Sequence, residues 1–380
     1  MIGDASHPPF GGYPRICGRV NAQKFNLYIR ISTSEASGYP PLSSVPTTLG
    51  TKKELFMKCI EIREYGSAEK LSVRSREDNL IPGDRQVLVE VKAASYNPVD
   101  TAIRTGMFDP VSARSFPQSQ GQDWAGVISA VGSEVTEWKV GDEVYGCQPA
   151  ADIHDDGSWA ELMRVDLEHL ARKPRNITWE EAAGLPLAGL TALQSLRDKG
   201  GLTPGKGMRV FINGASGGVG HTAVQLAKPL GAEYVCGTAS PKNHDIVGRL
   251  GADQVWDYRT FDPSKCEQKF DIFFDAAAKL EYTDVSDLLT EHGVYIRTRP
   301  SAKTVAAAAV TKAAGLVGFE KKAKVIWMEP NSADLAALSE FVENGKLRVI
   351  IAQSFPFESF RQFVEAGEAH EQPGKYILRI

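Results

Sequence analysis

The chain has 380 residues, of which 42% are hydrophobic and 24% charged, and its formal net charge is −4. This composition is ordinary for a globular protein and leaves room for two domains and a sizeable core. The slight excess of acids excludes the basic footprint of a nucleic-acid-binding protein, and no hydrophobic run reaches the length of a membrane span.

Cysteine spacing gives a second exclusion. The five cysteines lie far apart, and none forms a C-x-x-C pair: Cys17, Cys59, Cys147, Cys236 and Cys266. This pattern argues against a disulfide framework and against a cysteine zinc knuckle. We therefore expect a reducing compartment, the cytoplasm in the simplest case.

Residues 1–53 differ from the rest of the chain. They are rich in Ser, Thr, Pro and Gly, contain only Asp4 and Glu35 as acids, and carry recurring basic residues. A transit peptide for organelle import has such a composition, but no clean amphipathic helix or cleavage site stands out. A disordered extension, or a translation start placed too early, is the favoured interpretation, and ordered sequence is expected from Met57.

Residues 57–179 carry β signals. The stretch "RQVLVEVKAAS" (85–95) alternates in the manner of a half-buried strand, and turn residues recur at short intervals. We expect a compact, mostly antiparallel β unit with a few helices.

From about residue 180, strands and helices alternate, which predicts βαβ units and a parallel sheet covered on both faces. The predicted strands are 209–213, 233–238, 254–257, 270–274, 294–297 and 324–328. The predicted helices include 217–228, 241–250, 281–290 and 333–344. The Ala-rich run 305–319 predicts an ordinary buried helix, and the final "GKYILRI" predicts a strand that returns to the first domain.

The stretch "NGASGGVG" (213–220) follows the first strand of this array and opens a helix. Such a turn directs main-chain N–H groups and a helix N-terminus at a phosphate. A P-loop would need Gly-Lys-Ser/Thr here, and His221 and Thr222 follow instead. The dinucleotide motif remains, with Ala215 in place of its first glycine.

The end of the second strand indicates which dinucleotide. An acid there would bind the ribose hydroxyl of NAD, but the sequence is "CGTASPKN" (236–243). Ser240, Lys242 and Asn243 offer hydrogen bonds and a positive charge, which suit a 2′-phosphate. These residues predict NADPH as the cofactor.

With these residues in view, the chain resembles the zinc-free quinone-oxidoreductase branch of the medium-chain dehydrogenase/reductase superfamily. The resemblance covers about residues 57–380, and the matching motifs occur in the family's order. They are "AASYNPVDTAIRTGMF" (93–108), "GQDWAGVISAVGSEV" (121–135), "VGDEVYG" (140–146), "EAAGLPLAGLTALQSL" (181–196), "NGASGGVGHTAVQLAK" (213–228), "GADQVWDYR" (251–259) and "PGKYILRI" (373–380).

The resemblance implies an α/β protein of two domains. A GroES-like, mostly β catalytic domain would comprise residues 57–180 and 350–380, and a Rossmann domain with a doubly wound parallel sheet would comprise 181–349. The nicotinamide would lie in the cleft between them. Relatives are often dimers through an edge strand of the Rossmann sheet, so we expect a homodimer.

The resemblance also argues against zinc. Zinc-dependent relatives carry Cys at the position of Asn97, His-Glu at Gln122 and Asp123, and Cys at Leu187. Zinc in such a site binds thiolate and imidazole nitrogen, which these residues do not offer. The four-cysteine structural zinc lobe is also missing, because that region contains only Cys147.

Site residues follow from the motifs. Asn97 is expected to contact the substrate or the nicotinamide, and Asp100 to orient its loop; the alternative for Asn97 is a turn residue before Pro98. Relatives often have Tyr where Ala102 and Phe108 stand here, so the sequence identifies no proton donor. The residues expected to bind the cofactor are Thr191, Ser216, Gly217, Gly218, Val219, Gly220, Ser240, Lys242, Asn243 and Tyr258.

The expected activity is hydride transfer from NADPH to a quinone or to an activated alkene such as an enone or alkenal. Two alternatives remain open. One is a trans-acting enoyl reductase of a polyketide pathway, which would need a carrier-protein partner. The other is a non-enzymatic NADPH binder of the crystallin type.

Overall fold

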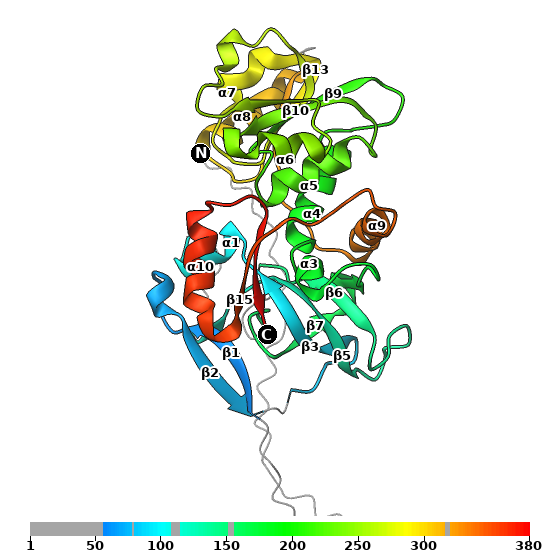
Figure 1. Ribbon diagram of the computed structural model, residues 1–380, viewed down its shortest axis with the longest axis vertical. Helices are drawn as coiled ribbons and strands as arrows, with labels where there is room; N and C mark the ends of the chain where they lie inside the picture. The colour runs from blue at the N-terminus through cyan, green and yellow to red at the C-terminus, as the bar shows by residue number, and fades with distance from the viewer. Residues whose placement is uncertain (1–55, 78–79, 108–114, 151–155, 316–319) are drawn as a thin grey trace, which may run out of the picture. The chain divides into compact units, whose positions relative to one another are not determined.

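The computed structural model describes residues 56–77, 80–107, 115–150, 156–315 and 320–380 (Figure 1). The predictions for residues 1–53 and for Phe108 lie outside the described residues. Contacts group residues 53–380 into one compact unit.

The first half of the unit is mostly β, in agreement with the sequence pattern. Its elements are β1 (Phe56–Ile62), η1 (Ala68–Lys70), β2 (Ser72–Glu77), β3 (Gln86–Ser95), α1 (Pro98–Arg104), β4 (Gln118–Ser119), β5 (Asp123–Val131), β6 (Glu143–Cys147), β7 (Leu162–Asp166), η2 (Leu167–His169) and β8 (Leu170–Arg172).

The second half alternates strands and helices. Its elements are α3 (Trp179–Ala183), α4 (Pro186–Gln194), the π-helical turn η3 (Ser195–Lys199), β9 (Met208–Asn213), α5 (Gly218–Ala227), β10 (Ala232–Ala239), η4 (Pro241–Asn243), α6 (His244–Arg249), β11 (Gln254–Asp257), η5 (Pro263–Lys265), β12 (Phe270–Asp275), α7 (Tyr282–Val285), η6 (Ser286–Leu288), β13 (Leu289–Arg297), α8 (Ala302–Ala314), β14 (Lys322–Val325), α9 (Ser332–Glu343), β15 (Ile351–Pro356), η8 (Phe357–Ser359), α10 (Phe360–Ala369) and β16 (Lys375–Arg379).

Strands β9 to β14 form one six-stranded sheet in the order β11-β10-β9-β12-β13-β14. All five pairings are parallel. This is the Rossmann order: β10 and β11 are added on one side of β9, and β12 to β14 on the other. Ligands bind outside the carboxyl ends of the strands at this switch in strand order, between β9 and β12. The fold class is therefore α/β with a doubly wound sheet.

The mostly β region contains a seven-stranded sheet in the order β15-β16-β3-β5-β6-β8, with β7 also paired to β3. Strand β16, near the end of the chain, pairs antiparallel with β3, and the two lie side by side in Figure 1. A smaller antiparallel sheet has the order β2-β1-β4. The C-terminal residues thus complete a sheet that begins nearly 290 residues earlier in the chain (Leu378 pairs with Ala94).

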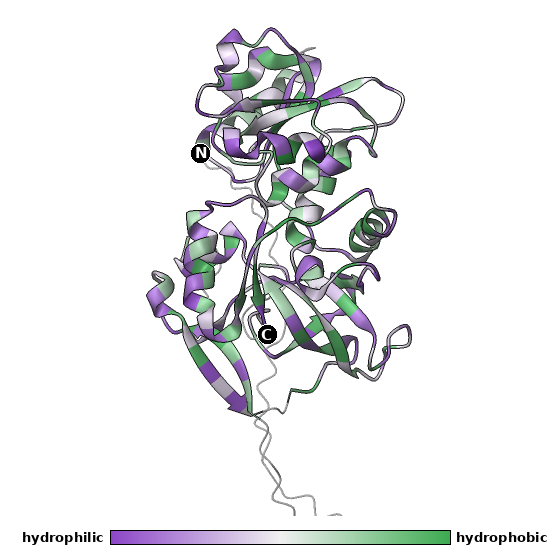
Figure 2. Cartoon of the chain, in the orientation of Figure 1, coloured by the Kyte–Doolittle hydropathy of each residue, from purple (hydrophilic) through white to green (hydrophobic). Residues whose placement is uncertain are grey.

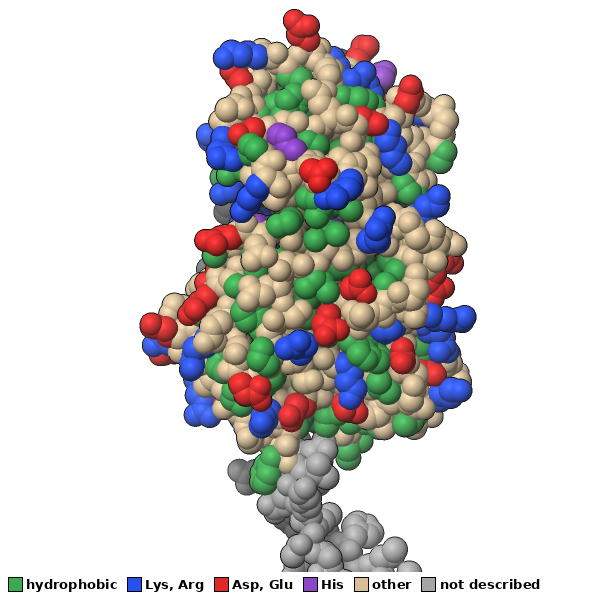
Figure 3. Space-filling model, in the orientation of Figure 1, with side chains coloured by type: hydrophobic (Ala, Val, Ile, Leu, Met, Phe, Trp, Pro, Cys, Tyr) green, Lys and Arg blue, Asp and Glu red, His purple; other side chains and the backbone are tan. Residues whose placement is uncertain are grey.

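Hydrophobic residues fill the interior of both regions. Figure 2 shows α10 with both hydrophobic and hydrophilic residues, and its buried residues are Phe360, Phe363, Val364 and Gly367. On the face seen in Figure 3, acidic and basic side chains are interspersed, with no large area of one sign.

Two predicted helices differ in the structure. The predicted helix 281–290 shrinks to α7 and the turn η6, because β13 already begins at Leu289. The predicted buried helix 305–319 is α8, and its Val305 and Val310 side chains are 53% and 66% exposed. Polar contacts decide which face turns inward: Thr304 donates to Glu281 at 2.8 Å, and Thr311 accepts from a main-chain N–H at 3.1 Å.

Candidate active site and cofactor site

The glycine-rich turn joins β9 to α5. Gly214 has φ +81°, and a Cβ on Gly220 would lie 2.0 Å from the Gly214 oxygen, so both positions require glycine. Gly217 is the N-cap of α5 and offers no capping side chain. The first-turn N–H groups of α5 are therefore available to an anion, and the helix dipole favours negative charge there.

A buried polar network supports this turn. Thr238 accepts from the Gly214 N–H at 3.1 Å and donates to Asn213 at 2.5 Å, and Asn213 donates to Asp275 at 2.7 Å. Burial raises the pKa of Asp275, against the hydrogen bond from Asn213. Sequence reasoning did not identify this network. Its signal is a polar residue at or near the carboxyl end of three neighbouring strands.

The predicted 2′-phosphate residues gather beside the turn. Asn243 donates to the Ser216 hydroxyl at 3.3 Å, and Lys242 Nζ donates to the main-chain oxygen of Glu371 at 3.0 Å. Ser240 is the N-cap of η4, at the end of β10.

Tyr258 lies near the same point, because its N–H donates to the Ala239 oxygen at 3.3 Å. The Arg259 guanidinium lies 5.5 Å from the Tyr258 ring centre. Sequence reasoning missed Arg259 as a second cation in this neighbourhood, although it directly follows the predicted tyrosine in "WDYR".

The loop between α10 and β16 rests on the glycine turn. The Gly374 N–H donates to the Ser216 oxygen at 3.1 Å. His370 has the left-handed φ of 50°, and a Cβ on Gly217 would lie 3.4 Å from its Nε2 atom. Burial lowers the pKa of His370, and the charge of Lys375 adds to this effect.

Asn97 is the N-cap of α1, and its contacts are all internal. Its N–H donates to Asp100 Oδ2 at 2.7 Å, and its Nδ2 donates to Asp123 Oδ2 at 2.8 Å. Its Oδ1 accepts from Lys375 Nζ. Asn97 therefore links α1 to β5 and β16.

Asp123 is the centre of this cluster and is fully buried. Its Oδ2 also accepts from Ser95 at 2.9 Å and lies 3.3 Å from Lys375 Nζ, while its Oδ1 accepts from the Leu187 N–H at 2.8 Å. Asn97 and Leu187, two positions where zinc-dependent relatives carry ligands, thus both contact Asp123, which stands at the second residue of the relatives' His-Glu pair. Lys375 was not identified from the sequence, because nothing local distinguishes it from a solvent-facing strand lysine.

Asp100 is buried at the first turn of α1, and its Oδ1 atom has no hydrogen-bond partner among the described residues. Burial raises the pKa of Asp100 to about 8, against the hydrogen bond from Asn97, and the nearby Asp123 charge adds to the rise. A carboxyl group with such a pKa is largely protonated at neutral pH.

Thr191 lies on α4, one turn after Leu187, and is almost fully buried. The contact between Leu187 and Asp123 fixes the start of α4 against the Asn97 cluster. The structure thereby brings Thr191, Asn97 and the glycine turn into one neighbourhood, since α4 also packs on α5.

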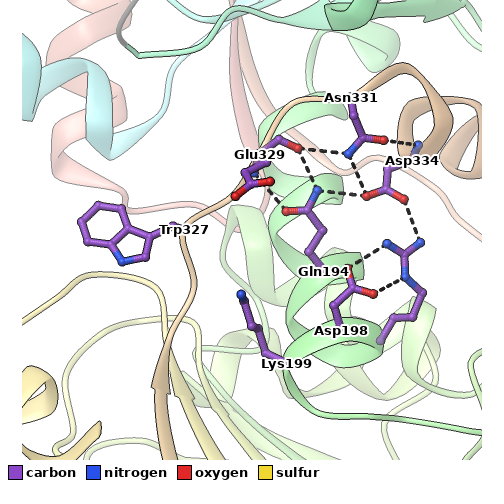
Figure 4. Close-up of a pocket in the computed structure, with 8 residues that line it drawn as sticks. Gln194, Asp198, Lys199, Trp327, Glu329, Asn331 and Asp334 are labelled. Atoms are coloured by element: carbon purple, nitrogen blue, oxygen red, sulfur yellow. Dashed lines mark hydrogen bonds and ion pairs between the residues drawn. The ribbon is translucent and has the colours of Figure 1, made fainter. Parts of the chain in front are cut away.

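A polar hollow of about 340 Å³ lies elsewhere, at the end of α4 (Figure 4). Gln194 donates to the Glu329 oxygen at 2.8 Å and to Asp334 at 2.9 Å, and Arg197 donates to Asp334 at 2.7 Å. The polar groups of these residues hydrogen-bond to one another, so they join the end of α4 to α9. Within the described residues, no group of three or more His, Cys, Asp or Glu side chains is placed to hold a metal ion.

Comparisons with known proteins agree with this geometry. A family model described as "Alcohol dehydrogenase GroES-like domain" matches residues 83–175, and one described as "Zinc-binding dehydrogenase" matches residues 250–378. The second description names a metal, but the chain has Asn97, Gln122-Asp123 and Leu187 at the positions where the resemblance implies metal ligands.

Several of the similar proteins are named as reductases or oxidoreductases. The chain is 32% identical to 2-methylene-furan-3-one reductase of Solanum lycopersicum, over 98% of this chain and 93% of that protein. It is 32% identical to the chloroplastic NADPH-dependent alkenal/one oxidoreductase of Arabidopsis thaliana, over 95% and 88%. The structure of Escherichia coli quinone oxidoreductase complexed with NADPH matches with a TM-score of 0.71 and 25% identity, over 85% and 100%. The chain belongs to the medium-chain dehydrogenase/reductase superfamily, in its quinone-oxidoreductase-like branch of oxidoreductases.

Proposed function

We propose that the protein is an NADPH-dependent reductase that transfers a hydride to a quinone or to the β-carbon of an activated alkene such as an enone or alkenal. The observation that carries this proposal is the uncapped glycine turn, flanked by Lys242 on one side and by the Asn97 cluster on the other. The similarity to an alkenal/one oxidoreductase and to a quinone oxidoreductase complexed with NADPH supports it.

The residues present fit a dinucleotide. The free N–H groups at the start of α5 would bind the pyrophosphate, and the glycines leave room for its approach. Lys242, Ser240 and Tyr258 would bind the 2′-phosphate, and Arg259 adds charge beside them. Thr191 would lie beside the nicotinamide. When bound, the cofactor supplies the hydride.

The chain's own part in the reaction is to position and to stabilise charge. Reduction of an enone at its β-carbon places negative charge on the carbonyl oxygen, which then needs a hydrogen-bond donor. The buried cluster around Asn97 is the candidate source of such a donor. The proton that completes the reduction would come from solvent.

A screen of NADPH oxidation tests the proposal. Quinones, alkenals, enones and enoyl thioesters are offered in parallel, and we expect turnover of quinones or enones. Turnover restricted to enoyl thioesters would favour the enoyl-reductase alternative. Tight NADPH binding without turnover of any acceptor would favour the non-enzymatic alternative and contradict the proposal.

We further propose a homodimer. Strand β14 is the edge of the parallel sheet, and the neighbouring α8 exposes Val305 and Val310. A second copy would cover this apolar face and pair the open strand edge. Light scattering after gel filtration should give twice the chain mass, and Val310→Glu should shift the protein toward the monomer. A wild-type monomer at micromolar concentration would contradict this.

The compartment is proposed to be reducing, either the cytoplasm or an organelle that imports the chain through residues 1–53. The four described cysteines are free thiols, which is consistent with either place. No helix among the described residues has the length and hydrophobicity to cross a bilayer. A fluorescent protein fused to residues 1–53 distinguishes the two, because only a targeting segment would redirect it.

A further inference from the structure

Lys375 occupies an unusual place for a lysine. It is the first residue of β16, only 4% of its surface is exposed, and its aliphatic chain passes the start of α5. A Cβ on Gly218 would lie 3.2 Å from Lys375 Cδ. The side chain therefore runs from the glycine turn into the cluster of Asn97 and Asp123, beside the proposed cofactor site.

The ammonium group has three N–H bonds and two hydrogen-bond partners among the described residues. It donates to Asn97 Oδ1 and to Asp123 Oδ2, the latter at 3.3 Å. One N–H remains for a ligand. A buried lysine that only neutralised a carboxylate would be expected to use its remaining donor on the protein as well, because an unsatisfied buried donor is costly.

The Lys375 ammonium group lies beside a position where zinc-dependent relatives carry a metal ligand. Asn97, Asp123 and Leu187 stand where zinc-dependent relatives carry metal ligands or their neighbours, and here their polar groups surround an ammonium or its counter-ion. A lysine charge can stabilise a developing oxyanion as a metal ion does, without the need for a ligand set.

We propose that Lys375 is a catalytic residue whose ammonium group stabilises the negative charge that forms on the substrate's carbonyl oxygen. The proposal deepens the proposed function and rests on it. Asn97 and Asp123 are then positioning residues that hold the ammonium group in place.

The proposed reduction adds a hydride and a proton to the carbon–carbon double bond of the substrate. The β-carbon of the substrate accepts a hydride from the reduced nicotinamide, and a C–H bond forms as the cofactor's C–H bond breaks. The carbon–carbon π pair shifts toward the carbonyl and leaves an enolate oxygen, which the third N–H of Lys375 stabilises. A proton from solvent then adds to the α-carbon and completes the reduction.

A charge-balanced pair of substitutions separates this role from a purely structural one. Lys375→Met alone leaves the Asp123 carboxylate buried without a counter-ion, which destabilises proteins strongly. The double variant Lys375→Met with Asp123→Asn removes both charges together. Asp123→Asn alone keeps the lysine but removes the carboxylate that positions it, so it measures how much of the double variant's effect comes from Asp123. The matched control is Lys173→Met, because Lys173 is also a buried lysine and pairs with Glu143 at 3.4 Å.

The first readout is turnover, measured with the melting temperature and the NADPH Kd of each variant. We expect the double variant to fold, to bind NADPH normally and to lose roughly a hundredfold or more in kcat, as when an oxyanion donor is removed. Lys173→Met should remain within about tenfold of wild type, and Asp123→Asn, which removes a positioning residue, should fall between wild type and the double variant. Recovery of wild-type kcat in the double variant would overturn the proposal and leave Lys375 a structural counter-ion.

The second readout does not depend on turnover. 4-Nitrophenol mimics the enolate, and its visible absorption reports the phenolate fraction when it binds to the NADP⁺ complex. We expect wild type and Lys173→Met to lower the pKa of bound 4-nitrophenol, and the double variant to lose this effect. An unchanged 4-nitrophenol pKa in the wild-type complex would contradict the proposal, whereas absence of any NADPH turnover in wild type would contradict the proposed function instead.

Discussion

Lys242 Nζ donates a 3.0 Å hydrogen bond to the main-chain oxygen of Glu371, 129 residues further along the chain. The contact joins the end of β10 to the loop that rests on the glycine turn. It holds a cation beside that turn before any ligand binds. A phosphate arriving there would meet a partly ordered lysine, which lowers the entropy cost of binding.

We therefore predict that Lys242→Ala weakens NADPH binding but leaves NADH binding nearly unchanged. A charge-assisted hydrogen bond contributes about 1.5–3 kcal/mol, so the NADPH Kd should rise roughly ten- to hundredfold. NADH lacks the 2′-phosphate and serves as the matched ligand. The measurement is the Kd of both cofactors by calorimetry, with Lys303→Ala on the exposed start of α8 as the control variant. An equal loss for both cofactors would mean that Lys242 supports the fold.

Stability should depend on pH through Asp100. Burial raises the pKa of Asp100 to about 8, so the native state binds a proton that the unfolded chain releases near pH 4. The free energy of unfolding should fall as pH rises between about 4 and 8, and this contribution should level off above that range. Asp100→Asn cannot titrate and should show a flatter profile in denaturant melts.

The control for this prediction is Asp334→Asn. Burial acts to raise the pKa of Asp334, but hydrogen bonds from Arg197, Asn331 and Gln194 outweigh it and lower the pKa. This variant should lose stability yet keep the wild-type slope between about pH 6 and 8. Identical slopes for wild type and Asp100→Asn would show that Asp100 is ionised in the native state.

Zinc should be absent at stoichiometric level from the purified protein. The ligand positions hold Asn97, Gln122 and Leu187, and the Lys375 ammonium group beside Asn97 and Asp123 repels a cation. Elemental analysis beside a zinc-dependent alcohol dehydrogenase is the measurement, and EDTA should leave turnover unchanged. One zinc per chain would refute this expectation.

Removal of residues 1–53 should leave the melting temperature and the activity unchanged. The first strand of the described fold, β1, begins at Phe56, and Met57 is already buried in it. Thermal melts and NADPH turnover of the shortened and full chains provide the comparison. A drop of many degrees would mean that the segment packs on the fold.

The local patterns predicted the elements that depend on short-range signals. The glycine turn between β9 and α5 follows from a buried strand, three glycines and an amphipathic stretch, which together permit few other structures. The six parallel strands followed from their hydrophobic runs and spacing, with boundaries within a few residues except for β13.

The rest depends on contacts between distant residues. Lys375 donates a hydrogen bond to Asn97, which lies 278 residues earlier in the chain. No local sequence pattern predicts that the Lys375 side chain is buried. Which face of α8 is buried likewise depends on a residue outside the helix, because Thr304 donates a hydrogen bond to Glu281. Hydrophobicity alone predicted an ordinary buried helix, whereas Val305 and Val310 are exposed. The roles expected for Asn97, Asp100 and the cofactor residues stay predictions.

Isotope transfer from the cofactor is the most direct test of hydride transfer from NADPH to an enone. Wild-type protein is incubated with NADPH deuterated at C4, on either face, and with an enone, and the product is analysed by mass spectrometry and NMR. We expect NADPH to be consumed and one deuterium to appear at the β-carbon with only one of the two C4-deuterated cofactors. The hydrogen added at the α-carbon should come from solvent. NADPH that stays unoxidised with every quinone and enone, or an enone product without deuterium at the β-carbon, would contradict the proposed function.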